Sequence, residues 1–307
     1  MDDVLVLWDI DGTLLNADGV GRDLYDVVFL QLFGRSLSAY APMAGRTDRA
    51  IILETLSLAG VDEPRRYVDP FIAGLVEHAS SVRSAVADRG HALPGAAAVL
   101  ATLAAARTRG SLAEPATAPP VTAQPVTAQP VTAPALAASL LSAPPPTARA
   151  AVPVMAADPA GGASGTGSAD GASGADGAEA VRVYQSVLTG NVRSVAEVKL
   201  AALGLREWLD LCIGAYGDDH EDRTELVHVA RRRAAAVHGR SAAAFGGTAT
   251  VVIGDTPLDI SAALAAGARA VGVATGSHSA DDLAMAGADA VLSDLTDTAV
   301  VLRALLP

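Results

Sequence analysis

The chain has 307 residues, and half of them are hydrophobic, so it is long and apolar enough to bury a sizeable core. Its net charge of -12 and its few aromatic side chains argue against binding to nucleic acid. A single cysteine, Cys212, rules out an intramolecular disulfide and a cysteine-held zinc site, and its apolar surroundings predict a small buried side chain. No run approaches the length of a membrane span and no leader precedes the first strand, which favours a soluble cytoplasmic protein.

The first apolar run, residues 4–8, predicts the central strand of a parallel sheet. It stops abruptly at Asp9 and Asp11, which Gly12 and Thr13 follow. Short apolar runs that end at turn residues are typical of strands buried on both faces. Because side chains alternate along a strand, Asp9 and Asp11 can face the same side. Two carboxylates this close need a cation or hydrogen-bond donors to offset their repulsion.

The next segment, residues 16–92, predicts a small all-helical domain inserted after the first strand. Apolar residues recur there at helical spacing in three stretches, which are 22–33, 48–59 and 64–88. The turn 45–48 (GRTD) stands at a helix start, where backbone amides can face an anion. An ordinary helix cap by Thr47 or Asp48 explains this turn equally well.

A change of composition follows an alanine-rich helix expected at 96–107. Residues 111–180 are dominated by Ala, Pro, Gly, Thr and Ser, contain no aromatic residue, and repeat the motif VTAQP. Proline this frequent disfavours helix and central strand, and the Gly-rich remainder buries too little apolar surface to offset chain entropy. We therefore predict a disordered insertion. A proline-rich docking segment is the alternative, although no aromatic or charged anchor flanks it.

The remainder of the chain alternates strands with helices, which predicts an α/β fold with a doubly wound parallel sheet. The expected strands are 183–188, 209–215, 248–253, 270–274 and 290–292. The expected helices are 194–203, 225–237, 260–266, 279–286 and one from 297. The predicted domains are a core of 1–15, 93–110 and 181–307, a helical domain of 16–92 and the insertion of 111–180.

Polar residues stand at or just beyond the ends of the predicted core strands. They are Asp9, Asp11, Thr189, Gly190, Asn191, Lys199, Asp255 and Asp259. Because the carboxyl ends of parallel strands converge on one edge of a sheet, we expect these residues to lie together. Oxygen ligands of this kind suit Mg²⁺, and a cation beside a lysine and exposed amides can bind phosphate. The acidic stretch 218–222 and Arg223 are interpreted as a solvated loop.

These residues resemble the four motifs of the haloacid dehalogenase superfamily, in the same order. The motifs are D-x-D-G-T at 9–13, the strand-terminal Thr189, Lys199 in the following helix, and G-D-x-x-x-D at 254–259. The resemblance covers residues 1–110 and 181–307. It implies a Rossmann-like core with a small helical cap, and the turn 45–48 resembles a cap segment of phosphoglycolate-phosphatase-like members.

The resemblance implies a magnesium-dependent hydrolase of a small phosphate ester that works through an aspartyl phosphate. Asp9 would attack phosphorus and bind Mg²⁺, and Asp11 would protonate the leaving oxygen and then activate water, with its backbone carbonyl on the metal. Lys199 would neutralise charge, Asp255 would bind Mg²⁺, and Asp259 would complete the outer shell or pair with Lys199. The implied phosphate and substrate contacts are Gly12, Thr13, Thr189, Gly190, Asn191 and Arg46.

Two other functions stay open. A sugar phosphomutase with a similar cap uses the same two aspartates, and a non-enzymatic binding protein could use the proline-rich segment. A dehalogenase is disfavoured, because that reaction resembles members that lack the second acid and Asp11 is present here. The sequence indicates neither the substrate nor the oligomeric state.

Overall fold

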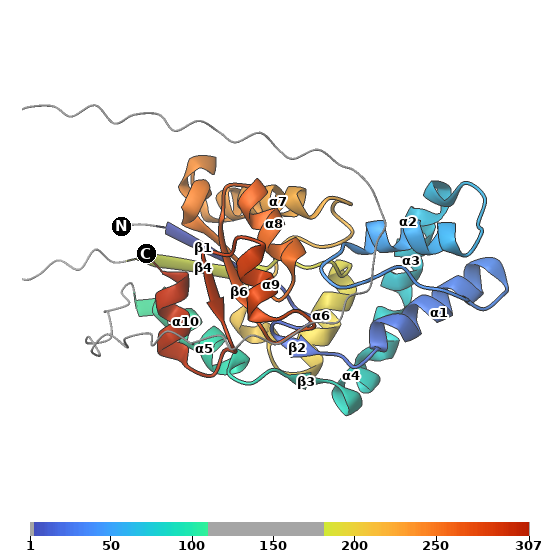
Figure 1. Ribbon diagram of the computed structural model, residues 1–307, viewed down its shortest axis with the longest axis horizontal. Coiled ribbons are helices and arrows are strands. Elements are labelled where there is room, and N and C mark those ends of the chain that lie inside the picture. The colour runs from blue at the N-terminus through green and yellow to red at the C-terminus, as the bar shows by residue number, and fades with distance from the viewer. Residues whose placement is uncertain (1–2, 110–180, 307) are drawn as a thin grey trace, which may run out of the picture. The chain divides into compact units, whose positions relative to one another are not determined.

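The structure is a computed structural model that describes residues 3–109 and 181–306, so the insertion predicted at 111–180 lies outside the described residues. Five strands form a parallel sheet in the order β4-β1-β5-β6-β7 (Figure 1). They are β1 (Asp3–Trp8), β4 (Arg182–Val187), β5 (Thr250–Gly254), β6 (Arg269–Val273) and β7 (Ala290–Leu292). β1 is paired on both sides, with β4 and with β5, so it is the central strand that the sequence predicts.

Helices cover both faces of the sheet, which explains why β1 is apolar along its length. Val6 and Trp8 enter one core, whereas Leu5 and Leu7 enter the other. The first core contains residues of α5 (Ala96–Arg109), α6 (Arg193–Ala202) and α10 (Thr298–Leu305). The second contains residues of α7 (Arg223–His238), α8 (Pro257–Ala265) and α9 (Ala280–Met285). The predicted α/β fold with a doubly wound sheet is confirmed.

The segment between β1 and α5 is mainly helical. Its helices are α1 (Val20–Phe33), α2 (Asp48–Leu58), α3 (Val68–His78) and α4 (Arg83–Arg89), with single 3₁₀ turns at η1 (Pro64–Tyr67) and η2 (Ala79–Val82). The single helical stretch expected at 64–88 is therefore divided. At the second division the hydroxyl of Ser81 donates to the carbonyl of His78, and such local bonds compete with the regular helix. Figure 1 shows α1, α2 and α3 grouped away from the sheet.

Two short strands mark the points where the chain enters and leaves this helical segment. β2 (Leu15–Asn16) and β3 (His91–Ala92) pair antiparallel. The amide of Leu93 also donates to the carbonyl of Leu14, at 2.9 Å. Both connections are thus held side by side next to the end of β1, which places the helical segment at the edge where the polar residues were expected.

The strand predicted at 209–215 is wrong. This stretch runs beside β4 but bonds to it only near its two ends, where the amides of Asp210 and Ala215 donate to β4 carbonyls at 3.0 Å. Between them the Asp210 carboxylate accepts from the amide of Cys212, and this local bond makes a turn in place of a ladder. Cys212 lies on that turn and is exposed, so the prediction that it is buried is also wrong.

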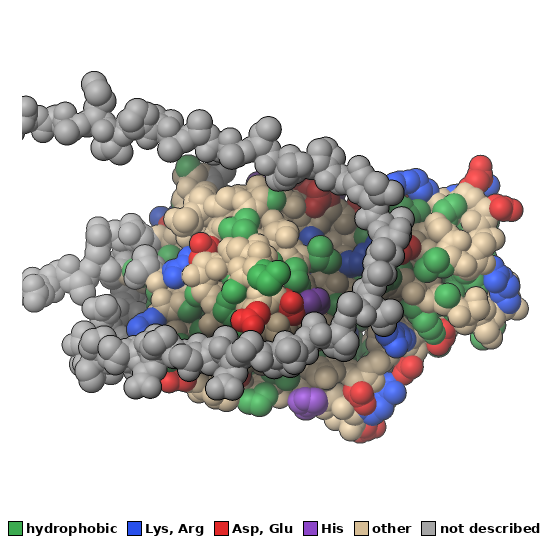
Figure 2. All heavy atoms as spheres, in the orientation of Figure 1, with side chains coloured by type: hydrophobic (Ala, Val, Ile, Leu, Met, Phe, Trp, Pro, Cys, Tyr) green, Lys and Arg blue, Asp and Glu red, His purple; other side chains and the backbone are tan. Residues whose placement is uncertain are grey.

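The surface charges of the described residues are mixed in sign. On the face shown in Figure 2, basic and acidic side chains are interspersed over the helical segment. Two of the three consecutive arginines in α7 are engaged rather than solvated, because Arg231 donates to the carbonyl of Ala266 and Arg233 pairs with Asp219, at 2.7 and 2.6 Å. No helix among the described residues has both the length and the apolar character needed to cross a bilayer.

Candidate active site

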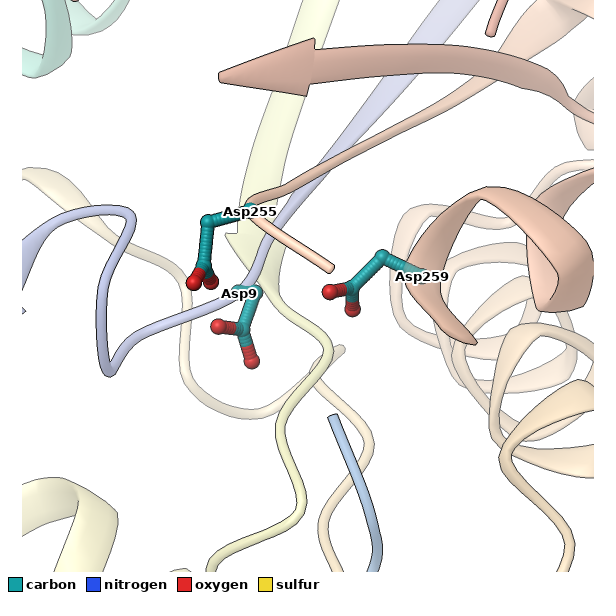
Figure 3. Close-up of side chains that lie close together, drawn as sticks. All are labelled: Asp9, Asp255 and Asp259. Atoms are coloured by element: carbon teal, nitrogen blue, oxygen red, sulfur yellow. The ribbon is translucent and has the colours of Figure 1, made fainter. Parts of the chain in front are cut away.

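Three buried carboxylates meet at the carboxyl edge of the sheet. Asp9 follows β1, Asp255 follows β5, and Asp259 lies in the first turn of α8. Each offers an oxygen within 4.8 Å of the others. Figure 3 shows their side chains directed toward a common space. The backbone topology brings two neighbouring strand ends and one helix start to a single point, which places these three carboxylates together.

A buried arginine compensates two of these carboxylates. Arg223, the first residue of α7, places Nη2 2.7 Å from Oδ1 of Asp9 and 2.5 Å from Oδ1 of Asp259. All three side chains are at most 9% exposed. The interpretation of Arg223 as part of a solvated loop is wrong. Its burial follows from the position of the α7 start, which Asp222 caps by accepting from the amide of Thr224.

The second predicted aspartate belongs to a separate ion pair. Nζ of Lys199 in α6 lies 2.8 and 2.7 Å from the two carboxylate oxygens of Asp11. Asn191 links the same groups, because its side-chain amide donates to Asp11 and its side-chain oxygen accepts from Lys199, at 2.7 and 2.8 Å. Lys199 is buried, whereas the Asp11 side chain is 41% exposed, so the carboxylate of Asp11 is the accessible member. The suggested pairing of Lys199 with Asp259 is not formed.

Burial dominates the electrostatics of Asp9 and Asp255. It raises the pKa of Asp9 well above the usual range, with Asp259 adding to the rise and Arg223 opposing it. Burial likewise raises the pKa of Asp255 to about 7, again helped by Asp259. For Arg223, burial favours the neutral form, but Asp259 and Asp9 outweigh this effect and raise its pKa. One arginine therefore leaves Asp9 and Asp255 with a cost of ionisation that a further cation would relieve.

The donor set fits a magnesium ion. Oδ1 of Asp255 accepts from the hydroxyl of Thr13 at 3.2 Å, and Asp9 uses Oδ1 toward Arg223. Asp259 is less free to bind a metal ion, because its Oδ2 accepts from the amide and hydroxyl of Thr256 in a capping box. Oxygen donors in a buried acidic pocket suit Mg²⁺, which needs few protein ligands. Asp9 and Asp255 are the side chains best placed to hold it, with Asp259 behind them.

The loop after β4 supplies neutral polar groups. Thr189 is fully buried, and its hydroxyl accepts from the backbone and side-chain amides of Asn191 at 3.2 and 2.9 Å. Thr189, Gly190 and Asn191 all line the cavity described below, as does Gly12. Thr13 does not line it, and its hydroxyl is directed to Asp255 instead.

The helical segment contacts the core at the start of α2. Thr47 is the N-cap residue of α2, since its hydroxyl accepts from the amide of Ala50, and the same hydroxyl donates to the carbonyl of Glu221. The interpretation of the turn 45–48 as an ordinary helix N-cap is therefore correct for Thr47. Arg46 pairs with Glu54 at 2.6 Å and reaches the carbonyl of Pro42.

A cavity of about 790 Å³ lies between the carboxylates and the helical segment. Its core side includes Asp9, Asp11, Lys199 and Asp255. Residues of the helical segment form the other side, among them Arg22, Tyr25, Arg46, Asp48 and Ile51. Every predicted site residue except Thr13 and Asp259 therefore lines a single cavity, which is large enough for a small metabolite.

Sequence reasoning missed three residues of this site. Arg223, Tyr25 and Asp48 were assigned no role there, yet all three are buried and line the cavity. Arg223 stands among acidic residues in the sequence, which suggests solvent exposure. One signal was available in the sequence. Arg223 directly follows an aspartate that can cap a long helix, and the first turn of such a helix lies near the carboxyl edge of the sheet.

Comparison with known proteins supports the superfamily resemblance. Residues 226–298 match the sequence model of the family described as HAD-hydrolase-like. No curated protein matches the chain in sequence. Among solved structures, a predicted phosphatase from Clostridium acetobutylicum is 13% identical and aligns over 99% of each chain with a TM-score of 0.52. A hydrolase from Pseudomonas syringae is 16% identical over 99% of this chain and all of its own, also with a TM-score of 0.52.

A haloacid dehalogenase-like family protein from Streptococcus pneumoniae is 11% identical and aligns over 98% of this chain and 97% of its own, with a TM-score of 0.50. At such identities the likeness concerns the fold. Taken with the match of residues 226–298 to the HAD-hydrolase-like family model, it confirms that this chain has the fold of the haloacid dehalogenase superfamily.

Proposed function

We propose that this protein is a magnesium-dependent phosphomonoester hydrolase that acts on a small phosphorylated metabolite through a phosphoryl-aspartate. The observation that carries the proposal is the separation of two carboxylates within one cavity. Asp9 is buried beside Asp255 and Arg223, while Asp11 is half-exposed and held by Lys199 and Asn191. Two carboxyl groups in such different environments are suited to different tasks in one reaction.

Asp9 is proposed as the nucleophile. Its carboxylate oxygen attacks phosphorus, the bond from phosphorus to the ester oxygen breaks, and the phosphoryl group is transferred to Asp9. Arg223 fixes one carboxylate oxygen of Asp9 and so restricts the rotation of the attacking group. When bound, Mg²⁺ would offset charge on the phosphoryl oxygens and keep the buried carboxylates ionised. Asp9 and Asp255 would hold it, together with the backbone carbonyl of Asp11.

Asp11 is proposed as the acid and base. In the first step it gives a proton to the leaving ester oxygen, and in the second it takes a proton from the water that attacks the phosphoryl-aspartate. Lys199 and Asn191 hold the Asp11 carboxylate by three hydrogen bonds of 2.7 to 2.8 Å. These contacts fix its orientation toward the cavity, which supports its assignment to proton transfer.

The remaining residues are assigned to binding. Thr189 and the amide of Gly190 are proposed to contact the phosphoryl oxygens, together with Gly12 and Asn191. The helical segment 16–92 is proposed to act as a cap that contributes the other wall of the cavity and contacts the leaving group. Its basic residues at the cavity include Arg22 and Arg46, and Arg46 is already paired with Glu54.

The experiment is an assay of phosphate release from an aryl phosphate ester with purified protein. We expect hydrolysis that requires Mg²⁺, stops with a chelator, and falls by at least about a thousandfold in Asp9→Asn. The matched control is Asp281→Asn, which changes an exposed aspartate of α9 in the same way and should keep wild-type activity. Undiminished hydrolysis in Asp9→Asn, or in the presence of the chelator, contradicts the proposal.

A sugar phosphomutase is the second candidate. A protein from Bacteroides vulgatus with 15% identity and a TM-score of 0.50 is provisionally named a beta-phosphoglucomutase. Both candidates would use Asp9 and Asp11. They differ in the product, since a mutase would isomerise a hexose 1-phosphate without net release of phosphate. The same protein sample, assayed with such a substrate, separates the two.

A further inference from the structure

Asp48 is a buried carboxylate that does not serve as a helix cap. It is the first residue of α2, but Thr47 caps that helix. Only 8% of Asp48 is exposed, and both of its carboxylate oxygens are used. Oδ1 accepts from the hydroxyl of Tyr25 and Oδ2 accepts from the backbone amide of Val192, each at 2.7 Å. The second bond joins the helical segment to the loop after β4.

Backbone contacts reinforce the same junction. The amide of Asp48 donates to the carbonyl of Gly190 at 2.7 Å. Gly190 is packed so closely that a Cβ atom there would lie 1.8 Å from the carbonyl oxygen of Arg46. At Gly217 a Cβ atom would lie 1.7 Å from the carbonyl oxygen of Gly190. Three chain segments therefore meet without room for side chains, and Asp48 supplies the side chain that ties them together.

The bonds of Asp48 bear on the residues proposed to bind phosphate. Thr189, Gly190 and Asn191 lie within three residues of Val192, and Asp48 bonds to the chain on both sides of Asn191. Burial of a carboxylate is unfavourable and raises the pKa of Asp48 to about 6, against the opposing effect of its two donors. An apolar residue would avoid this cost, but it could not hold the amide of Val192.

We propose that Asp48 is a positioning residue that holds the loop 189–192 in its phosphate-binding conformation, so that the phosphate site is complete only while the helical segment is docked. The proposal rests on the proposed function, and it adds a specific link between the cap and phosphate binding. Asp48 does not touch the reacting atoms; it acts through the backbone of the loop. Tyr25 orients the Asp48 side chain through the hydrogen bond from its hydroxyl.

The test compares Asp48→Ala and Asp48→Asn in the full chain. The asparagine side chain can still accept from Val192 and can donate to the Tyr25 hydroxyl, whereas alanine can do neither. We expect Asp48→Ala to weaken inhibition by inorganic phosphate by about tenfold or more, because one well-formed bond to a charged group is lost. KM for an aryl phosphate should rise in parallel, and Asp48→Asn should restore most of both.

A matched control removes a similar bond elsewhere in the helical segment. Thr55 in α2 is fully buried, and its hydroxyl accepts from the amide of Ala41 at 3.1 Å. Thr55→Ala should lower stability without weakening phosphate inhibition. Hydrogen–deuterium exchange of the peptide that covers 187–195 gives a second readout, and we expect faster exchange in Asp48→Ala but not in Thr55→Ala.

The outcomes separate this inference from the proposed function. An inactive wild-type protein contradicts the proposed function, and the exchange measurement then still tests the link between Asp48 and the loop. An active and folded Asp48→Ala variant with unchanged phosphate inhibition and unchanged exchange at 187–195 overturns the inference alone. Equal losses in Asp48→Ala and Thr55→Ala also overturn it, because they show a general effect of cap stability.

Discussion

The site places one buried arginine against two buried carboxylates, and this arrangement makes Arg223 important to folding as well as to the proposed reaction. A buried charge is tolerated when its partner is close and well aligned, and removal of the partner leaves an uncompensated charge in a poorly solvated site. Arg223 contacts Asp9 and Asp259 at 2.7 and 2.5 Å, and a third carboxylate, Asp255, is adjacent.

We predict that Arg223→Met destabilises the protein by about 3 to 5 kcal/mol, because Asp9 and Asp259 lose their charged partner. Urea unfolding at neutral pH measures the free energy of unfolding. The control is Arg89→Met, which removes an ion pair with Asp23 at the surface and should cost about 1 kcal/mol or less. Equal effects of the two substitutions would contradict the assignment of Arg223 to a buried pair.

Asp48 gives a pH-dependent prediction. Its pKa in the folded protein is raised to about 6 from the ordinary 3.8, so the folded state holds the proton more tightly than the unfolded state. The resulting stabilisation is fully present below the unfolded pKa and is lost as the pH rises through about 6. Ionisation of Asp48 is therefore less favourable in the folded protein than in the unfolded chain.

We expect Asp48→Asn, which cannot ionise, to gain stability relative to wild type by on the order of 1 kcal/mol between about pH 5 and about pH 8. Urea unfolding of both proteins across this range checks the sign. A difference that is constant with pH would show that Asp48 has an ordinary pKa.

The aspartates were predictable at this scale because they follow apolar strands, and the ends of parallel strands converge. Asp9 and Asp255 needed only that rule. The basic side chains that pair with the aspartates of the site were less predictable, because a lysine or arginine far away in sequence can reach any of several carboxylates. Lys199 pairs with Asp11, and Arg223 occupies the place beside Asp9 and Asp259. Such pairing is set by side-chain directions in the folded protein, which periodicity does not encode.

Among the structural elements, the loop after β4 and the start of α2 form the tightest junction. Gly190 is the critical position, since a methyl group there would overlap the backbone carbonyl of Arg46 rather than a movable side chain. The two elements can accommodate it only by separating.

We predict that Gly190→Ala lowers phosphatase activity by at least about tenfold and raises amide exchange in 187–195, because an overpacked contact must shift by displacement of backbone. The comparison is Gly246→Ala, where a Cβ atom would lie 3.2 Å from its nearest neighbour, in a core loop away from the cavity. Wild-type kinetics in Gly190→Ala would mean that the helical segment is not docked on this loop in solution.

The elements themselves were largely predictable from apolar periodicity, and β7 begins and ends at the predicted residues. The strand predicted at 209–215 is not formed, and the reason is clear. Leu209 to Ala215 is apolar enough for a strand, but Asp210 turns the chain by bonding to the amide of Cys212. A local side-chain bond to the backbone thus overrode a pattern that was otherwise correct.

For the whole molecule, the described residues hold the sheet, both cores and the complete cavity. α5 packs on β4, and the side-chain amide of Gln185 in β4 donates to the carbonyl of Leu100 in α5 at 2.8 Å. The two elements that flank the predicted insertion are thus joined independently of it.

We therefore predict that replacement of residues 111–180 by a short Gly/Ser linker changes kcat and KM by less than about twofold, because a flexible connection can still join α5 to β4. Steady-state assays and thermal unfolding of the shortened protein provide the check. Loss of both activity and stability would show that the segment is part of the fold, and loss of activity alone would assign it a role at the site.

The most direct test of the account is to locate the phosphoryl group on the protein. In Asp11→Asn the attack by Asp9 on an aryl phosphate should still proceed, because a good leaving group needs little protonation, while hydrolysis of the phosphoryl-aspartate should slow by about a hundredfold or more. Mass spectrometry of this variant after brief reaction should find one phosphoryl group, on Asp9. A phosphoryl group on any other residue, or wild-type turnover by Asp9→Asn, would contradict the account.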